Sequence, residues 1–353
     1  MERKKLIIVS PHGCIRVKKQ AGTLKSLGYH ITLVTTRDHK EGVFFDKVYT
    51  YKYENQLKDI LGLFKEDVNS SIFHYHNEPT WPVVLIRTMY PDAIIVSDVH
   101  DSNYWRTDIK IGKKEINEYI HWDDEDMSMR CADAFVAPSP SCVAEIKGRL
   151  KKSKIKKPVV FLPSALPRDL YLYSSFNFSG GVVAQGGVTI PGMTKGDGWR
   201  DYTEFAKKIQ GKRQLYIYSA DISGNEKAPV ESHYAKLDVK MGKYDYMRLL
   251  PALGSHTWNL VGNLVDAKVW KYALPNKFFD AMAACTPSVV LNCSEVSKLV
   301  QEYDIGITVN TVKELVKRWD EYLECRMNLL KYRDELCMEN YIGNLTTLYK
   351  EIC

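Results

Sequence analysis

The chain has 353 residues, a length that suits two domains, each large enough to bury a core of its own. Apolar residues make up 45% and charged residues 26%, which is typical of a soluble globular protein and excludes extensive disorder. The net charge of +6 is too small, for this size, to indicate nucleic-acid or membrane binding by itself.

The eight cysteines are scattered, with no CxxC pair and no Cys/His cluster at zinc spacing. We therefore expect reduced thiols and no metal site. No apolar stretch approaches the roughly 20 residues that a membrane span needs, and the first apolar run is too short for a signal peptide. These features predict a cytoplasmic protein without a transmembrane segment.

Apolar runs and helical stretches alternate through the first half of the chain. Such runs are typical of strands buried on both faces, and their alternation with helices predicts a parallel, doubly wound sheet. We therefore expect a Rossmann-like domain over residues 1–175. Its expected strands are residues 5–10, 30–35, 71–76, 93–98, 134–137 and 159–162.

The same alternation restarts in a glycine-rich stretch at residues 179–187. It predicts a second Rossmann-like domain over residues 176–335. Residues 336–353 are expected to form a helix that packs back across the junction. The expected strands of the second domain are residues 180–187, 214–219, 258–261, 288–291 and 306–309.

A helix is predicted to begin with Asn276 as its N-cap and to end before Pro287. Lys277 and Asp280 are three residues apart and should share one exposed face of its first turn. A helix N-terminus and a lysine suit a diphosphate, and a carboxylate suits the two hydroxyls of a ribose. An amphipathic helix with a solvated salt pair is an equally good interpretation of this segment alone.

Polar side chains follow several expected strands of the first domain. Ligands of open α/β sheets bind beyond the carboxyl ends of the strands, so these positions are candidate site residues. Histidines and carboxylates there suit a metal, acid–base chemistry or the binding of sugar hydroxyls, while each histidine alone also suits a hydrogen-bonded core position. The candidates are His12, Gly13, His76, Asn77, His100 and Asp101.

A second phosphate-binding turn is expected in the second domain. One strand ends at Gly187, and Thr189 and Lys195 follow before the next helix. Backbone N–H groups at this turn, together with Lys195, would meet a diphosphate from the side opposite Lys277 and Asp280.

The segment from Pro275 to Val290 resembles the Pro-Asn-Lys, acidic residue, Met-Ala-Ala-Gly-x-Pro-Val-Val pattern of retaining GT-B glycosyltransferases of the family-4 type. The turn from Gly187 to Lys195 is similar to the glycine-rich turn and lysine of that family. The resemblance covers nearly the whole chain and implies an α/β fold of two doubly wound Rossmann-like domains facing a central cleft. It also implies a nucleoside diphosphate sugar as co-substrate, with no cofactor and no metal.

By this resemblance the second domain holds the donor, with Asp280 on the ribose and Lys277 and Lys195 near the diphosphate. Gly187 and Thr189 belong to the same donor site. The first domain would bind the acceptor through His12, Gly13, His76 and Asn77. His100 would contact the transferring sugar, and we assign it a catalytic role together with Asp101.

The chain departs from the family pattern at several positions. Tyr272 stands where the family often has the first of two glutamates, and Cys285 stands in place of a glycine. An arginine expected near Thr189 is missing unless Arg200 replaces it.

The function predicted from the sequence is transfer of a hexose or pentose to an acceptor hydroxyl with retention. The acceptor is expected to be a glycan, a lipid-linked sugar or a modified base in DNA. A basic run at residues 147–157 with seven Lys and Arg and no acid suits a polyanion such as DNA or a membrane surface, which would place the protein at the membrane periphery. A solvated helix face is the competing interpretation of this run.

Two other functions fit the same residues. A nucleotide-sugar epimerase has the same two-domain architecture and would use the histidines and carboxylates for elimination and addition. A catalytically idle nucleotide-sugar-binding protein would explain the departures at Tyr272, Thr189 and Cys285.

Overall fold

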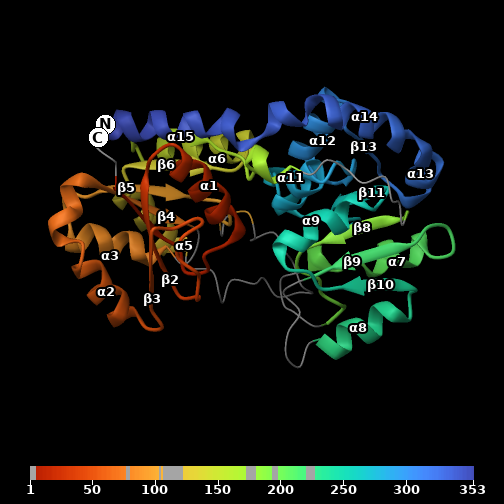
Figure 1. Ribbon diagram of the computed structural model, residues 1–353, viewed down its shortest axis with the longest axis horizontal. Helices are drawn as coiled ribbons and strands as arrows, with labels where there is room; N and C mark the ends of the chain where they lie inside the picture. The colour runs from red at the N-terminus through yellow and green to blue at the C-terminus, as the bar shows by residue number, and fades with distance from the viewer. Residues whose placement is uncertain are drawn as a thin grey trace. The chain divides into compact units, whose positions relative to one another are not determined.

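The computed structural model describes residues 5–76, 80–102, 105, 122–171, 180–192, 198–219 and 227–353 (Figure 1). Two compact units divide these residues. The first contains residues 5–105 and 122–167 in their described parts, together with 337–353, and the second contains the described part of 168–336. Both are α/β units built on one parallel sheet, as predicted.

The first unit is organised by a seven-stranded sheet in which all paired strands are parallel. Val9 pairs with Tyr75, and His76 pairs with Asp98, so the carboxyl ends of three neighbouring strands lie together. In spatial order the strands are β3 (Lys47–Thr50), β2 (His30–Thr35), β1 (Lys5–Val9), β4 (Ser71–His76), β5 (Ile94–Asp98), β6 (Ala134–Ala137) and β7 (Val159–Phe161).

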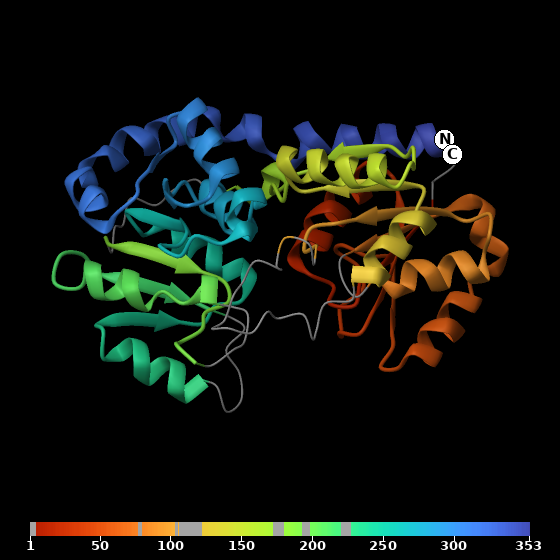
Figure 2. The same cartoon turned by 180° about the vertical axis from the view of Figure 1, so that it is seen from behind.

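Helices cover the first sheet, and one of them comes from the end of the chain. Helix α15 (Met338–Ile352) packs against α1 (Ile15–Ser26), β6 and β7, and Figure 2 shows it running along this unit. Its apolar face buries Met338, Ile342, Leu345, Leu348 and Tyr349. The other helices are α2 (Glu54–Gly62), η1 (Lys65–Ser70), α3 (Trp81–Met89), α5 (Trp122–Cys131) and α6 (Pro140–Lys152).

The second unit has a six-stranded parallel sheet. Its strands, in spatial order, are β10 (Val239–Gly242), β9 (Leu215–Tyr218), β8 (Val182–Gln185), β11 (Trp258–Gly262), β12 (Ser288–Leu291) and β13 (Gly306–Thr308). Its helices are η3 (Arg168–Leu170), η4 (Gly198–Arg200), α7 (Thr203–Ile209), α8 (Lys227–Ala235), α9 (Tyr246–Gly254), α10 (Lys268–Tyr272), α11 (Asn276–Ala283), α12 (Ser294–Glu302), α13 (Val312–Lys317), η6 (Trp319–Glu321), α14 (Tyr322–Tyr332) and η7 (Arg333–Leu336).

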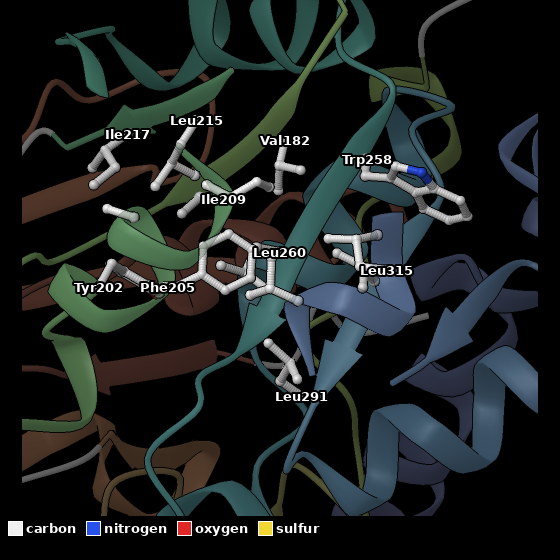
Figure 3. Packing of buried hydrophobic residues seen from close by; sticks show 14 of the residues in the cluster. Val182, Tyr202, Phe205, Ile209, Leu215, Ile217, Trp258, Leu260, Leu291 and Leu315 are labelled. Carbon is white, nitrogen blue, oxygen red and sulfur yellow. The ribbon is translucent and has the colours of Figure 1, made fainter. Parts of the chain in front are cut away.

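The core of the second unit lies between its sheet and helices α7 and α13 (Figure 3). Phe205 and Ile209 from α7 meet the strand residues Val182 and Leu260, and Leu315 from α13 belongs to the same cluster. Burying side chains of this size contributes about 1.5–3 kcal/mol each. The core therefore holds α7 and α13 against the sheet.

Several local expectations differ from the structure. The N-cap of α11 is Pro275, and Asn276 is its first residue, because the chain turns from extended to helical geometry one residue earlier than expected. The strand expected at 180–187 is shorter, since Gly180, Gly181 and Gly186 have positive φ values that do not fit a strand. Within the described residues, no helix is long and apolar enough to cross a membrane.

Candidate functional site

The turn after β8 lies against an arginine. Gly186 has a φ of +98°, a left-handed conformation that glycine adopts without strain. A Cβ on Gly187 would lie 2.8 Å from Nη1 of Arg200, so the guanidinium packs directly on the bare backbone of this turn. The backbone N–H of Thr189 donates to the carbonyl of Arg200 at 3.2 Å. Arg200 is therefore at the glycine-rich turn, where an arginine was expected from the resemblance.

Side-chain amides hold the segment that carries Arg200. Nδ2 of Asn263, just beyond β11, donates to the carbonyls of Trp199 at 3.1 Å and Asp201 at 2.8 Å. Asn292, just beyond β12, in turn donates to the carbonyl of Asn263 at 3.0 Å. Two neighbouring strand ends thus position Arg200 through a chain of hydrogen bonds.

Lys277 is held at the same edge from both its backbone and its side chain. Its carbonyl accepts from Nε2 of Gln185, the last residue of β8, at 2.8 Å. Its ammonium donates to the hydroxyl of Tyr202 at 3.0 Å and lies 5.5 Å from the ring centre of Trp270. A cation over an aromatic ring gains electrostatic attraction from the ring face. The lysine is therefore half-buried and oriented at the start of α11.

Asp280 is buried, with 3% of its surface exposed, which corrects the expectation that it lies on an exposed turn. The hydroxyl of Tyr246 on α9 donates to Oδ1 of Asp280 at 2.7 Å. Burial and the charge of Asp280 raise the pKa of Tyr246, so this hydroxyl stays protonated and donates. The expectation failed because helix α9, which supplies Tyr246, packs over the face of α11 that carries the carboxylate.

The positions that depart from the family pattern lie close to this group in the chain. Tyr272 is half-buried at the end of α10. Cys285 is buried and follows the C-cap of α11 with a φ of +59°, a conformation that glycine adopts at lower cost. The structure therefore retains the backbone turn of the pattern without its glycine.

In the first unit, Asp98 ends β5 and is the centre of a buried network. Arg16 on α1 binds it, with Nε 3.0 Å from both carboxylate oxygens. Gln20, one turn further along α1, donates from Nε2 to Oδ2 at 2.8 Å. Burial would raise the pKa of Asp98, but the charge of Arg16 and the hydrogen bond with His100 act together against it, and the pKa lies well below its usual value. Asp98 is therefore an anion whose charge is balanced by Arg16.

His100 connects this carboxylate to a cysteine. Its Nδ1 is 2.9 Å from Oδ1 of Asp98, and its Nε2 is 3.6 Å from Sγ of Cys14. Burial would lower the pKa of His100, but the charge of Cys14 and the hydrogen bond to Asp98 raise it to about 10. Burial would raise the pKa of Cys14, but the charge of His100 lowers it. Each group therefore stabilises the charged form of the other, a thiolate beside an imidazolium.

His74 and His76 lie on β4 beneath this pair. Their rings stack with centres 4.4 Å apart, and Nδ1 of His74 pairs with the hydroxyl of Tyr349 at 2.6 Å. Both histidines are fully buried, and among the described residues neither ring nitrogen of His76 has a hydrogen-bond partner. Burial lowers the pKa of His74 to about 4 and that of His76 well below its usual value. Both rings are therefore neutral.

His74, His76 and Asp98 also bring atoms of metal-ligand type within 4.8 Å of one another. A cation there would lie beside the guanidinium of Arg16, which already balances the carboxylate, and like charges repel strongly in a buried environment. The three side chains therefore suit a buried polar network better than they suit a metal site.

The turn between β1 and α1 completes this edge of the first unit. His12 is exposed, and Gly13, with a φ of +49°, lies against the ring of His39. Burial and the charge of Arg37 lower the pKa of His12, while the charge of half-buried Asp101 raises it. Because His12 follows β1 and Asp101 follows β5, this interaction shows that the two loops lie close together. Asn77 and Lys195, which were also predicted as site residues, lie outside the described residues.

The partners of these residues were not predicted from the sequence. Helix α1 buries Arg16, Lys19 and Gln20, a polar stripe at helical spacing on a helix that covers a sheet, and this stripe would have indicated a buried polar network. No local signal pointed to Tyr246 or Tyr349.

Comparisons with known proteins identify the fold. No protein-family model and no curated protein matches the chain. Among solved structures, an alpha-glucosyltransferase in complex with UDP and a 13-mer DNA containing a HMU base has a TM-score of 0.66 at 12% identity, with 100% of each chain covered. TarM has a TM-score of 0.65 at 8% identity over 98% of each chain.

A UDP-GlcNAc 2-epimerase from Neisseria meningitidis is also similar, with a TM-score of 0.54 at 12% identity over 98% of this chain and 100% of that one. The chain therefore has a GT-B-like fold of two Rossmann-like domains. Solved structures with a similar fold thus include an alpha-glucosyltransferase and a UDP-GlcNAc 2-epimerase.

Proposed function

We propose that the chain is a glycosyltransferase that moves a sugar from a nucleoside diphosphate sugar to an acceptor hydroxyl, with retention. The observation that carries this proposal is the group at the carboxyl edge of the second sheet. There the turn at Gly186 and Gly187 lies against Arg200, and a hydrogen bond from Gln185 ties the end of β8 to Lys277 at the start of α11.

This group suits a diphosphate. Two cationic side chains, a glycine turn with accessible backbone and a helix N-terminus all favour an anion with several oxygens. Retaining transfer passes through a positively charged sugar centre while negative charge builds up on the leaving diphosphate, so cations fixed beside it lower the barrier. Lys277 and Arg200 supply this charge, and Lys195 is proposed to add to it.

Asp280 is proposed to hold the donor ribose together with Tyr246. One oxygen of Asp280 accepts from Tyr246, so the pair presents a fixed carboxylate and a phenol at one place. Buried polar groups that are already oriented discriminate strongly between ligands that complete their hydrogen bonds and ligands that do not.

The first unit is proposed to bind the acceptor and to supply His100 to the transferring sugar. A protonated imidazole donates hydrogen bonds, so His100 would stabilise sugar oxygens and would not act as a base. Asp101, His12 and Gly13 line the same sheet edge, and Asn77 is proposed to join them. The full burial of His76 favours a supporting role beneath His100 over direct contact with the acceptor.

The test is a thermal-shift screen of nucleoside diphosphate sugars, followed by transfer assays with the sugars that stabilise the protein. A donor at a hundred times its dissociation constant should add about 2.7 kcal/mol of stability. Lys277→Met and Arg200→Met keep the apolar stems and should abolish this shift, whereas Lys271→Met, at an exposed lysine of α10, should not. Equal shifts in all three variants would place the donor elsewhere.

His100→Gln should lower kcat more than it weakens donor binding, because a contact made mainly in the transition state appears in kcat. A variant with unchanged kcat and weaker donor binding would remove His100 from the reaction centre.

Epimerisation is the second candidate, because the first unit contains titratable groups, Cys14, His100 and Asp98, in direct contact. Incubation of the protein with a nucleotide sugar and no acceptor separates the two activities. Formation of an epimer favours the epimerase, and slow hydrolysis of the donor favours the transferase. If the donor binds tightly and neither product forms, the chain is an idle binding protein.

A polyanionic acceptor is proposed to contact the basic run at residues 147–157. A hollow of about 290 Å³ lies among its lysines. Helix α6 begins after the carboxyl end of β6 and leads back to the amino end of β7. The hollow is therefore at the end of the sheet opposite to His100. The length of the helix gives a separation of roughly 20 Å between the hollow and His100. Only a long acceptor or a surface could contact both edges. The hollow is lined by Lys147, Leu150, Lys151, Lys154, Ile155, Lys156 and Lys157.

A further inference from the structure

Cys14 differs in its surroundings from the other cysteines of the chain. It is the N-cap residue of α1, and it is partly exposed. Cys131 is also partly exposed and Cys353 is exposed, while the other five cysteines are buried. Cys14 therefore combines access from solvent with a position at the positive end of a helix of 12 residues.

A chain of polar side chains lies behind the thiol. Nε2 of His100 is 3.6 Å from Sγ, and Nδ1 of the same ring is 2.9 Å from Asp98. Asp98 is fixed in turn by Arg16. The carboxylate holds the ring in the orientation that directs Nε2 to the sulfur, so a proton leaving the thiol has a base in contact with it.

The charged groups around the sulfur agree with this arrangement. His100 lowers the pKa of Cys14 against the effect of burial, while Asp101 acts in the opposite direction and is weaker. A thiolate is the reactive form of cysteine, and helix N-termini and imidazolium groups are the surroundings that stabilise it.

We infer that Cys14 is a reactive thiolate, activated by His100 and Asp98, and a modification site for peroxide-class oxidants and alkylating electrophiles. With a peroxide, the sulfur attacks one oxygen, the S–O bond forms and the O–O bond breaks. The hydroxide that leaves takes the Nε2 proton of His100 and departs as water. Sulfur is oxidised by two electrons to a sulfenic acid, the peroxide is reduced, and His100 becomes neutral.

This chemistry goes beyond sugar transfer and does not depend on it. Oxidation would remove the positive charge of His100 from the sheet edge, so the same residue would couple the redox state of the thiol to any ligand that His100 holds. A reductant of the thiol class would reverse the sulfenic acid.

The test labels the intact chain with a limiting amount of iodoacetamide and measures each cysteine by peptide mass spectrometry. At pH 6, Cys14 should react on the order of tenfold faster than Cys131, because few ordinary thiols are ionised at that pH. The rate at Cys14 should change little between pH 6 and 8, whereas that of free glutathione rises with each unit. His100→Gln should abolish the advantage of Cys14.

Hydrogen peroxide followed by dimedone, which captures sulfenic acids, should label residue 14 in the wild type and not in Cys14→Ser. Cys353 reports on accessibility in every sample. A Cys14 rate equal to that of Cys131 at pH 6, a rate that rises with pH like that of glutathione, or no dimedone adduct at residue 14 would each overturn the inference.

Discussion

At the scale of single residues, the contact between Asp280 and Tyr246 changes what a substitution there should do. Asp280→Ala removes the acceptor of a buried phenol, and a buried polar group that loses its partner costs about 1–3 kcal/mol. We expect this variant to lose that much free energy of unfolding in urea, in addition to any loss of donor binding. Asp280→Asn, which keeps an acceptor oxygen, should lose less. Full stability of the alanine variant would show that Tyr246 finds another acceptor.

Some site residues could be predicted from the sequence, but their long-range partners could not. Lys277 could be proposed because it lies beside a local signal, a helix start. Arg200 was named only as a replacement for the arginine that the family resemblance implies. The partners of Asp98 and His74 could not be proposed, because Arg16 is 82 residues from Asp98 and Tyr349 is 275 residues from His74. Such pairs are set by which helix covers which strand, and a linear pattern does not contain that information.

At the scale of elements, strands β2, β4 and β6 lie at the residues that the sequence predicts, because each is a continuous buried run apart from the half-buried His30 at the start of β2. Strands β3 and β10 were missed. Both are terminal in the strand order of their sheets, and both are partly exposed and carry lysine, so neither forms an apolar run.

The two histidines of strand β4 make the free energy of unfolding of the first unit depend on pH. His74 and His76 stay neutral in the folded chain, because burial lowers both pKa values, but they bind protons in the unfolded chain below about pH 6.5. The unfolded state is then favoured as pH falls from about 6.5 to 4, by about 1.4 kcal/mol per pH unit for each proton. Denaturation curves of His76→Leu should therefore show a shallower loss of stability over this range than the wild type. Equal slopes would mean that His76 is protonated in the folded state.

The basic run at residues 147–157, at the end of helix α6, can be tested by substitution of its lysines. Lys157 donates to carbonyls of Met129, Arg130 and Ala132 at the end of α5, so its replacement would disturb the fold as well as the charge. Changing the other four lysines of the hollow to glutamine should weaken binding to duplex DNA or anionic vesicles. On DNA, the slope of log K against log salt should become shallower by about 0.9 for each phosphate that the variant no longer neutralises. The four are Lys147, Lys151, Lys154 and Lys156.

The control for this experiment replaces four exposed lysines of the second unit, namely Lys207, Lys208, Lys212 and Lys236. It changes the net charge equally and should leave binding less affected. If both sets of substitutions weaken binding to the same extent, general charge and not the hollow attracts the polyanion.

At the scale of the whole molecule, α15 ties the end of the chain to the first unit. Removing residues 337–353 would uncover α1, β6 and β7 and leave His74 without its contact to Tyr349. Hydrogen exchange at the amides of β4 and β6 should become faster, whereas β11 and β12 of the second unit serve as an internal control and should keep their protection. Unchanged exchange in β4 would show that the first sheet is stable without this helix.

The same helix sets the order in which the chain can reach its final state during translation. A ribosome releases the residues of the first unit up to 167, then those of the second unit, and only then the helix that closes the first. Roughly 180 residues separate these two events, and at about 5–20 residues per second this takes about 10–35 s. Throughout that interval the nascent first unit presents an apolar surface to solvent. A chaperone that recognises such surfaces would therefore meet this protein through the uncovered faces of α1 and β7.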